Sequence, residues 1–212
     1  MSKLAIDVAL LVDEAASNIV IALNKELLTG AEDEIVLGEK GGIPHVTLAM
    51  GLMEEDKLPE ISQRLEKIAG SYAPLDLVVQ GVEVGPVRRD GRVISGLNVR
   101  KTDELQHLHE RILTDIIARC TYEGVRTDMF YGTPAKLSEY WASGKVSTNI
   151  HAQFHPHITI GFGTLPPLEK PLALKASTLA LCHLGAHSTC RKILAQCELN
   201  LGEQYNAAKN GD

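Results

Sequence analysis

Two histidines, each followed two positions later by a threonine, are the groups in this chain best suited to chemistry. They lie in two segments of nearly the same sequence, PHVTLAMG at 44–51 and PHITIGFG at 156–163. Proline, histidine, threonine and the closing glycine are identical in the two segments, and the other positions are apolar or small in both. Agreement at this level within one chain indicates an internal duplication. The four residues are His45, Thr47, His157 and Thr159.

Two imidazole groups facing one cleft could divide acid and base work between them. An imidazole has an ordinary pKa of about 6.5, so it can give or take a proton at neutral pH. Cleavage of a phosphodiester needs both roles, because one group removes a proton from the attacking hydroxyl or water and another protonates the leaving oxygen. The threonine hydroxyls can donate hydrogen bonds to non-bridging phosphate oxygens. Each segment thus supplies one proton-transfer group and one phosphate donor.

Both segments are predicted to be strands, because they alternate in side-chain type, are rich in β-branched residues and end at a glycine. Residues two positions apart in a strand point to the same face. The histidine and the threonine of each segment therefore project together. We expect the rest of the chain to bring the two faces into one cleft.

The remaining pattern predicts an α+β fold with antiparallel sheets. The arrangement expected is bilobal, with two pseudo-symmetric antiparallel-sheet lobes, outer helices and a central cleft, in one domain over 1–200 followed by a polar, frayed tail over 201–212. The irregular stretch 121–150 is expected to be functional or mobile. Strands are expected over 4–12, 44–51, 75–84, 93–99, 156–163, 174–184 and 189–199, and helices from Asp13 or Ser17 to Gly30, over 56–69 and over 102–120.

Composition limits the classes of function. The 212 residues, 44% of them hydrophobic and 23% charged, are typical of a soluble globular protein. The net charge of −6 argues against electrostatic binding of long duplex nucleic acid, but it is compatible with one local phosphate-binding pocket. The N-terminal apolar run is broken by Asp7 and Asp13 and predicts neither a membrane span nor a signal peptide. The cysteines show no secreted disulfide framework, so a cytoplasmic protein with reduced thiols is expected. The protein is also expected to be a monomer.

The two motifs, HVTL at 45–48 and HITI at 157–160, resemble those of the two-histidine (2H) phosphoesterase superfamily. Within it they look like the LigT-like RNA 2′,3′-cyclic phosphodiesterases, which are often called 2′-5′ RNA ligases. The resemblance implies a bilobal α+β fold, no metal and no cofactor. It also implies hydrolysis of 2′,3′-cyclic phosphates on RNA ends or nucleotides, or of 2′-5′ phosphodiester bonds, with RNA ligation at the same site. The residues implied are His45 and His157 as the catalytic pair, with acid and base unassigned, and Thr47 and Thr159 as phosphate ligands.

Two other classes of function are compatible with parts of the sequence. A non-catalytic module that binds RNA ends or nucleotides would have no need for two groups that titrate near neutral pH. A zinc hydrolase could use His151, His155 and His157, but Pro156 disturbs the ladder and no carboxylate or cysteine completes the set. The run from Cys182 to Cys190, which also holds two histidines, reads as a hairpin with incidentally buried cysteines. The enzyme without metal is therefore the leading hypothesis.

Contacts to the rest of a nucleotide are harder to assign from the sequence. A nucleotide site usually offers an aromatic platform for the base and a cation for flanking phosphate. The three arginines at 88, 89 and 92 are predicted to be a solvated hairpin tip around an Asp-Gly turn. The substrate-contact candidates are Arg126, Phe130, Tyr131, Trp141 and Phe154.

Overall fold

The computed structural model describes residues 2–147 and 153–200, with strands and helices in the order expected from the sequence. Asp13 caps the first helix by accepting a hydrogen bond from the backbone N–H of Ala16 at 2.8 Å. Pro59 in the first turn of the second helix fixes where that helix begins. In chain order the elements are β1 (Lys3–Val12), α1 (Glu14–Leu27), β2 (His45–Glu54), η1 (Glu55–Lys57), α2 (Leu58–Ala69), β3 (Leu75–Val84), β4 (Ile94–Val99), α3 (Asp103–Asp115), η2 (Ile117–Arg119), η3 (Thr127–Met129), α4 (Glu139–Ala142), β5 (His157–Phe162), β6 (Leu172–Leu184), η4 (Ala186–Ser188) and β7 (Cys190–Glu198).

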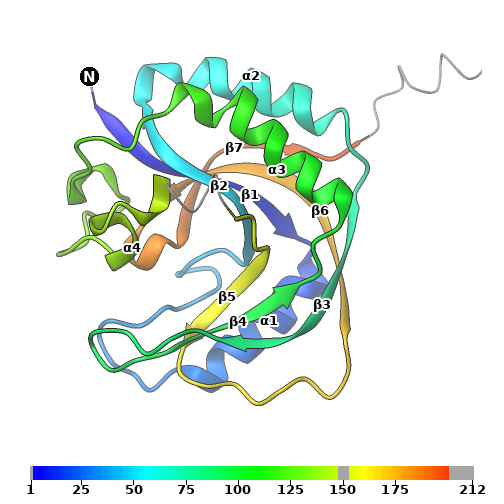
Figure 1. The fold of residues 1–212 in the computed structure, drawn as a ribbon, viewed down its shortest axis with the longest axis vertical. Coiled ribbons are helices and arrows are strands. Elements are labelled where there is room, and N and C mark those ends of the chain that lie inside the picture. The colour runs from blue at the N-terminus through cyan, green and yellow to red at the C-terminus, as the bar shows by residue number, and fades with distance from the viewer. Residues whose placement is uncertain (1, 148–152, 201–212) are drawn as a thin grey trace, which may run out of the picture.

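The strands form one seven-stranded sheet in the order β2-β1-β6-β3-β4-β5, with β7 also paired to β6. The pairs between these strands are antiparallel. The two motif strands, β2 and β5, are therefore the two ends of the path. The sheet curls so strongly that these ends lie close together (Figure 1). Curvature of one sheet, rather than adjacency in it, brings the two motifs into one cleft.

The antiparallel α+β class is confirmed, and the structure shows how the two halves are joined. They are not separate sheets, because β6 pairs through Leu172–Ala176 with β3 and through Ala176–His183 with β1. The helices lie outside the curved sheet, with α2 and α3 at the end that holds β2 and β7 and α1 at the end that holds β4 and β5 (Figure 1). None of the helices in the described ranges has the length and apolar character needed to span a membrane. The expected tail at 201–212 lies outside the described residues.

Each motif strand packs against the helix that precedes the other motif strand. The helix α1, which leads to β2, lies against β5, and α3, which leads to β5, lies against β2. The two halves of the chain therefore exchange helices, as expected for two halves related by a pseudo-two-fold axis. Each half of the cleft therefore packs against a helix that comes from the other half.

Both motif strands carry a β-bulge at the same place. In the pairing of β1 with β2, Thr47 and Ala49 have partners and Leu48 is the extra residue. In the pairing of β4 with β5, Thr159 and Gly161 have partners and Ile160 is the extra residue. A bulge leaves one residue unpaired and bends the strand, which re-aims the side chains beside it.

The backbone carbonyl of each bulged residue is satisfied by a buried polar side chain from the exchanged helix. Nδ1–H of His109 on α3 donates to the Leu48 carbonyl at 2.7 Å, and the Asn24 amide on α1 donates to the Ile160 carbonyl at 2.7 Å. A buried carbonyl without such a partner would be costly. The two bonds therefore fix each motif strand at the residue directly after its threonine.

Asn24 is expected to be a main determinant of stability. Its amide also donates to the Ile35 carbonyl and its oxygen accepts from the Leu37 N–H, so Asn24→Ala leaves several buried polar groups unpaired. We expect a loss of roughly 3 kcal/mol in the free energy of unfolding, measured by urea denaturation. Asn18→Ala, an exposed site on the same helix, is the matched control and should change little. Equal effects of the two substitutions would contradict this role.

Candidate active site

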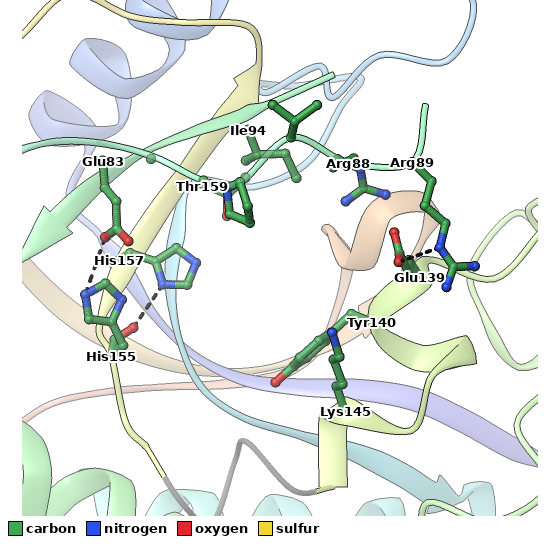
Figure 2. A pocket seen from close by; sticks show the side chains of 14 residues that line it. Glu83, Arg88, Arg89, Ile94, Glu139, Tyr140, Lys145, His155, His157 and Thr159 are labelled. Atoms are coloured by element: carbon green, nitrogen blue, oxygen red, sulfur yellow. Dashed lines mark hydrogen bonds and ion pairs between the residues drawn. The ribbon is translucent and has the colours of Figure 1, made fainter. Parts of the chain in front are cut away.

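Both motif histidines are oriented by the same backbone contact. Nδ1–H of His45 donates to the carbonyl of Ile43 at 2.6 Å, and Nδ1–H of His157 donates to the carbonyl of His155 at 2.9 Å (Figure 2). In each case a proline stands between the two residues, and the residue before a proline is held extended. With Nδ1 occupied in this way, Nε2 is the nitrogen through which each ring can exchange a proton.

The structure brings the four motif residues together. His45, Thr47, His157 and Thr159 line one cavity of about 440 Å³ between β2 and β5. A neighbouring cavity of about 490 Å³ shares His157 and Thr159 with it. Phe154 also lines the first cavity.

Beneath His45 and Thr47 lies a buried carboxylate. Asp7 on β1 has no exposed surface, and its Oδ2 accepts a hydrogen bond from the Thr47 hydroxyl at 2.7 Å. The same oxygen lies 3.3 Å from Nε2 of His45. An ionised carboxylate beside an imidazole stabilises the protonated ring.

The second half of the cleft has no such carboxylate at the equivalent position. Asp7 pairs with Met50, the fifth residue after His45, and Ile94 pairs with Phe162, the fifth residue after His157. Ile94 therefore stands where Asp7 stands in the first half. The backbone geometry of the site is duplicated, but its charge is not.

This difference separates the two histidines electrostatically. Burial by itself lowers the pKa of His45, but the hydrogen bond and negative charge of Asp7 outweigh it and raise the pKa above its ordinary value. Although His157 is exposed toward the cavity, the surrounding protein removes enough water to lower its pKa; the hydrogen bond to the His155 carbonyl acts against this, and the nearby His155 and His45 rings add to it. The protonated ring is thus more strongly favoured at His45 than at His157.

Of the aromatic candidates, Phe154 is the one that reaches the cavity. Its ring stacks on His109 with centroids 4.2 Å apart and planes 4° from parallel. Since His109 also holds the bulge of β2, this aromatic wall is fixed to the motif strand. Tyr140 lines both cavities and faces His157 from the opposite side (Figure 2).

The other candidates have positions that packing or pairing explains. Trp141 is buried and meets Phe130 edge-on, with ring centroids 5.4 Å apart. Tyr131 packs edge-on against His183, and Arg126 pairs with Asp128 at 3.0 Å. Among the described residues that line the two cavities, Arg126, Phe130, Tyr131 and Trp141 do not occur. Their placement gives no support to substrate contact.

Only part of the zinc alternative taken from the sequence falls on described residues. His151 lies outside the described residues, and Nε2 of His155 lies 3.4 Å from Glu83. In the run from Cys182 to Cys190, His183 contacts the Met129 carbonyl instead, and His187 pairs with Asp33. Both cysteines of that run are buried, as expected.

Sequence reasoning missed three contributors to the site. Asp7 was visible as a lone acid inside an otherwise apolar strand, which is a sign of a partnered buried charge. Arg88 lies at the predicted hairpin turn, and its side chain also lines both cavities, with Nε 3.9 Å from Oδ1 of Asp90 and without a hydrogen-bond acceptor among the described residues. Lys145 lines the second cavity next to Tyr140 (Figure 2). No local sequence signal marks Arg88 or Lys145.

Comparison with known proteins identifies a matching protein family and solved structures with a similar fold. The family model described as "2′-5′ RNA ligase superfamily" matches residues 40–183. No curated protein sequence matched the chain.

Several solved structures share the fold. The protein TT0787 of Thermus thermophilus is 16% identical with a TM-score of 0.62, over 94% of this chain and 100% of that one. E. coli LigT complexed with NADP+ is 16% identical with a TM-score of 0.55, over 94% and 99%. E. coli LigT complexed with phosphate is 17% identical with a TM-score of 0.53, again over 94% and 99%. At these identities the likeness shows the fold.

The electrostatic difference between the histidines can be measured directly. Following the ring protons by NMR in EDTA, we expect His45 to titrate above the ordinary pKa of about 6.5 and His157 to titrate below it. Asp7→Asn removes the negative charge that favours the protonated ring, so it should lower the pKa of His45. Glu83→Gln is the control, because Glu83 acts on His157 and should leave His45 unchanged. A pKa of His45 that is insensitive to Asp7→Asn would contradict the assignment.

Proposed function

The chain belongs to the 2′-5′ RNA ligase superfamily, and we propose that it is a metal-independent phosphodiesterase of the two-histidine type. Its substrates in this proposal are 2′,3′-cyclic phosphates on RNA ends or nucleotides, or 2′-5′ phosphodiester bonds, with RNA ligation as the reverse use of the same site. The observation that carries the proposal is the shared cavity with His45 and His157, each oriented through Nδ1 by the same backbone contact.

We assign the role of general base to His157. Its neutral ring, held by the His155 carbonyl, presents an unprotonated Nε2 in the cavity. There it can accept a proton from the attacking water as the oxygen approaches phosphorus. The lowered pKa favours the neutral ring that this role needs.

We assign the role of general acid to His45. Its Nδ1–H already donates to the Ile43 carbonyl, and its Nε2 lies next to the Asp7 carboxylate, so both ring nitrogens face acceptors. That arrangement favours the doubly protonated ring, which can give the Nε2 proton to the leaving 2′ or 3′ oxygen. Asp7 is then a positioning residue, since it acts through His45.

The two threonines contribute unequally to phosphate binding in this proposal. The Thr159 hydroxyl has no hydrogen-bond partner within the part of the chain that the structure describes, so it is free to donate to a non-bridging oxygen. The Thr47 hydroxyl donates to Asp7 and must turn from it to reach the phosphate. Thr159 is thus the ready donor and Thr47 the one that substrate binding rearranges.

The walls of the cavities suggest how the rest of a nucleotide is held. Arg88 and Lys145 are cations placed for phosphate oxygens, and Phe154 and Tyr140 offer aromatic faces for a base. E. coli LigT, which shares the fold, has been crystallised with phosphate and with NADP+. These features support small substrates and RNA ends rather than long duplexes. The free thiols of all four cysteines are in keeping with a cytoplasmic setting.

The proposal is tested by turnover in excess EDTA on 2′,3′-cyclic nucleotides and on oligonucleotides that end in a cyclic phosphate or carry a 2′-5′ bond. His45→Ala and His157→Ala should each lower kcat/KM by about 10²–10⁴-fold, because each removes one proton-transfer group. His107→Ala, an exposed histidine on α3, is the matched control and should retain activity.

Three outcomes would count against the enzyme. Activity that depends on added metal would overturn the metal-independent mechanism. Activity that survives in the His45→Ala, His157→Ala double variant would remove the histidines from it. Binding of these substrates without product under any condition would instead indicate a non-catalytic binding module.

A further inference from the structure

Three side chains that are good zinc ligands meet directly beneath the cavity. The carboxylate of Asp7, Nε2 of His45 and Sγ of Cys190 come from three strands and offer ligand atoms within 4.8 Å of one another. Asp7 and Cys190 have no exposed surface, and the side chain of His45 is 12% exposed, on the cavity side. Zinc in proteins is bound by this combination of thiolate, imidazole and carboxylate.

Two of the distances between these atoms, both measured to Oδ2 of Asp7, are compatible with a tetrahedral zinc ion. With Zn–N and Zn–O bonds of about 2.1 Å and Zn–S of about 2.3 Å, adjacent ligands lie about 3.4 Å (N to O) and 3.6 Å (S to O) apart. Nε2 of His45 is 3.3 Å from Oδ2 of Asp7, and Sγ of Cys190 is 3.6 Å from the same oxygen.

The groups that usually support metal ligands are also present. Metal-bound histidines donate their other ring N–H to a carbonyl or carboxylate, and ligating carboxylates accept further hydrogen bonds. Nδ1–H of His45 donates to the Ile43 carbonyl, which leaves Nε2 as the ligand nitrogen. The Thr47 hydroxyl donates to Asp7. The cluster is therefore pre-oriented for coordination.

An independent observation points to a missing partner at the same place. Oδ1 of Asp7 is buried and has no hydrogen-bond partner in the described part of the chain. A buried carboxylate oxygen in this state is costly, because it has lost water and gained nothing in return. A cation bound by both carboxylate oxygens of Asp7 would supply the missing interaction at Oδ1.

We propose that Asp7, His45 and Cys190 form a binding site for one zinc ion, and that zinc bound there switches the enzyme off. The switch rests on the proposed function, since zinc on Nε2 occupies the nitrogen from which His45 gives its proton. Asp7 and Cys190 lie below the cavity while His45 lines it, so the remaining coordination position would face the substrate. The zinc-bound protein would be inactive, and removal of zinc by a chelator would restore activity.

Binding is tested with Co²⁺ as a spectroscopic probe of the metal-free protein, which requires no turnover. We expect one equivalent to bind and to give the near-ultraviolet charge-transfer absorption of a thiolate bound to cobalt. Cys190→Ser removes the thiolate but keeps a donor to Asp7, and should weaken binding at least about 100-fold, since loss of an outer partner alone costs about 10–100-fold. Cys197→Ser, at the other end of β7, is the matched control and should keep the band.

Inhibition is tested with Zn²⁺ on the active protein. Stoichiometric Zn²⁺ should abolish turnover in the wild type and in Cys197→Ser, EDTA should restore it, and Cys190→Ser should remain active at the same Zn²⁺ concentration. Circular dichroism confirms that each variant is folded, and Cys190→Ala replaces Cys190→Ser if the latter is not.

The outcomes separate this site from the proposed function. No thiolate–cobalt band, or a band that survives Cys190→Ser, overturns the metal site whether or not the protein hydrolyses phosphodiesters. A band that depends on Cys190 in a protein without turnover supports the site and counts against the enzyme. Zinc that binds through Cys190 but activates the metal-free protein contradicts the switch.

Discussion

The site depends on two buried hydrogen bonds that hold the ends of one sheet in place. His109 and Asn24 each reach from a helix to the carbonyl of a bulged residue, Leu48 on β2 and Ile160 on β5. Each helix comes from the half of the chain opposite to the strand it holds. A curled sheet whose ends met only through side-chain packing could slide by a residue, and a slip of one residue turns every side chain to the other face. The bulges and their partners fix the register where the histidine and threonine need it.

The two halves of the site share a backbone arrangement, but one difference in sequence gives the two histidines different proton affinities. Asp7 beneath the first motif and Ile94 beneath the second occupy equivalent places in the ladder. The carboxylate raises the pKa of His45, whereas the pKa of His157 is lowered by its surroundings. Pairs of titratable groups whose environments push their pKa values apart are what acid–base catalysis at neutral pH requires. The same carboxylate, with Cys190 beside it, is also what makes the first half a candidate for zinc.

Much of this was predictable from the sequence, for local reasons. Alternation, β-branched residues and stop glycines predicted the strands, and the repeated motif predicted that four distant residues would share a cavity. The bulges were not predictable, because the extra residue is defined by the partner strand and Leu48 and Ile160 look like ordinary apolar strand residues. The role of Asp7 depends on the pairing of β1 with β2, which brings its carboxylate into contact with His45 and Thr47. The sequence of β1 alone does not define that pairing. Trp141 is buried because the irregular segment folds back over it. An aromatic residue can serve either in the core or in a binding site, so the residue type alone did not predict this burial.

The central claim is that both histidines act on one phosphate. A crystal structure of the protein grown in EDTA with inorganic phosphate tests it most directly. We expect one phosphate in the cavity between β2 and β5, with Nε2 of His45 and Nε2 of His157 each within about 2.7–3.2 Å of its oxygens and the Thr159 hydroxyl donating to it. A phosphate bound at full occupancy to one histidine alone, with the other turned away or too distant to reach it, would contradict the claim.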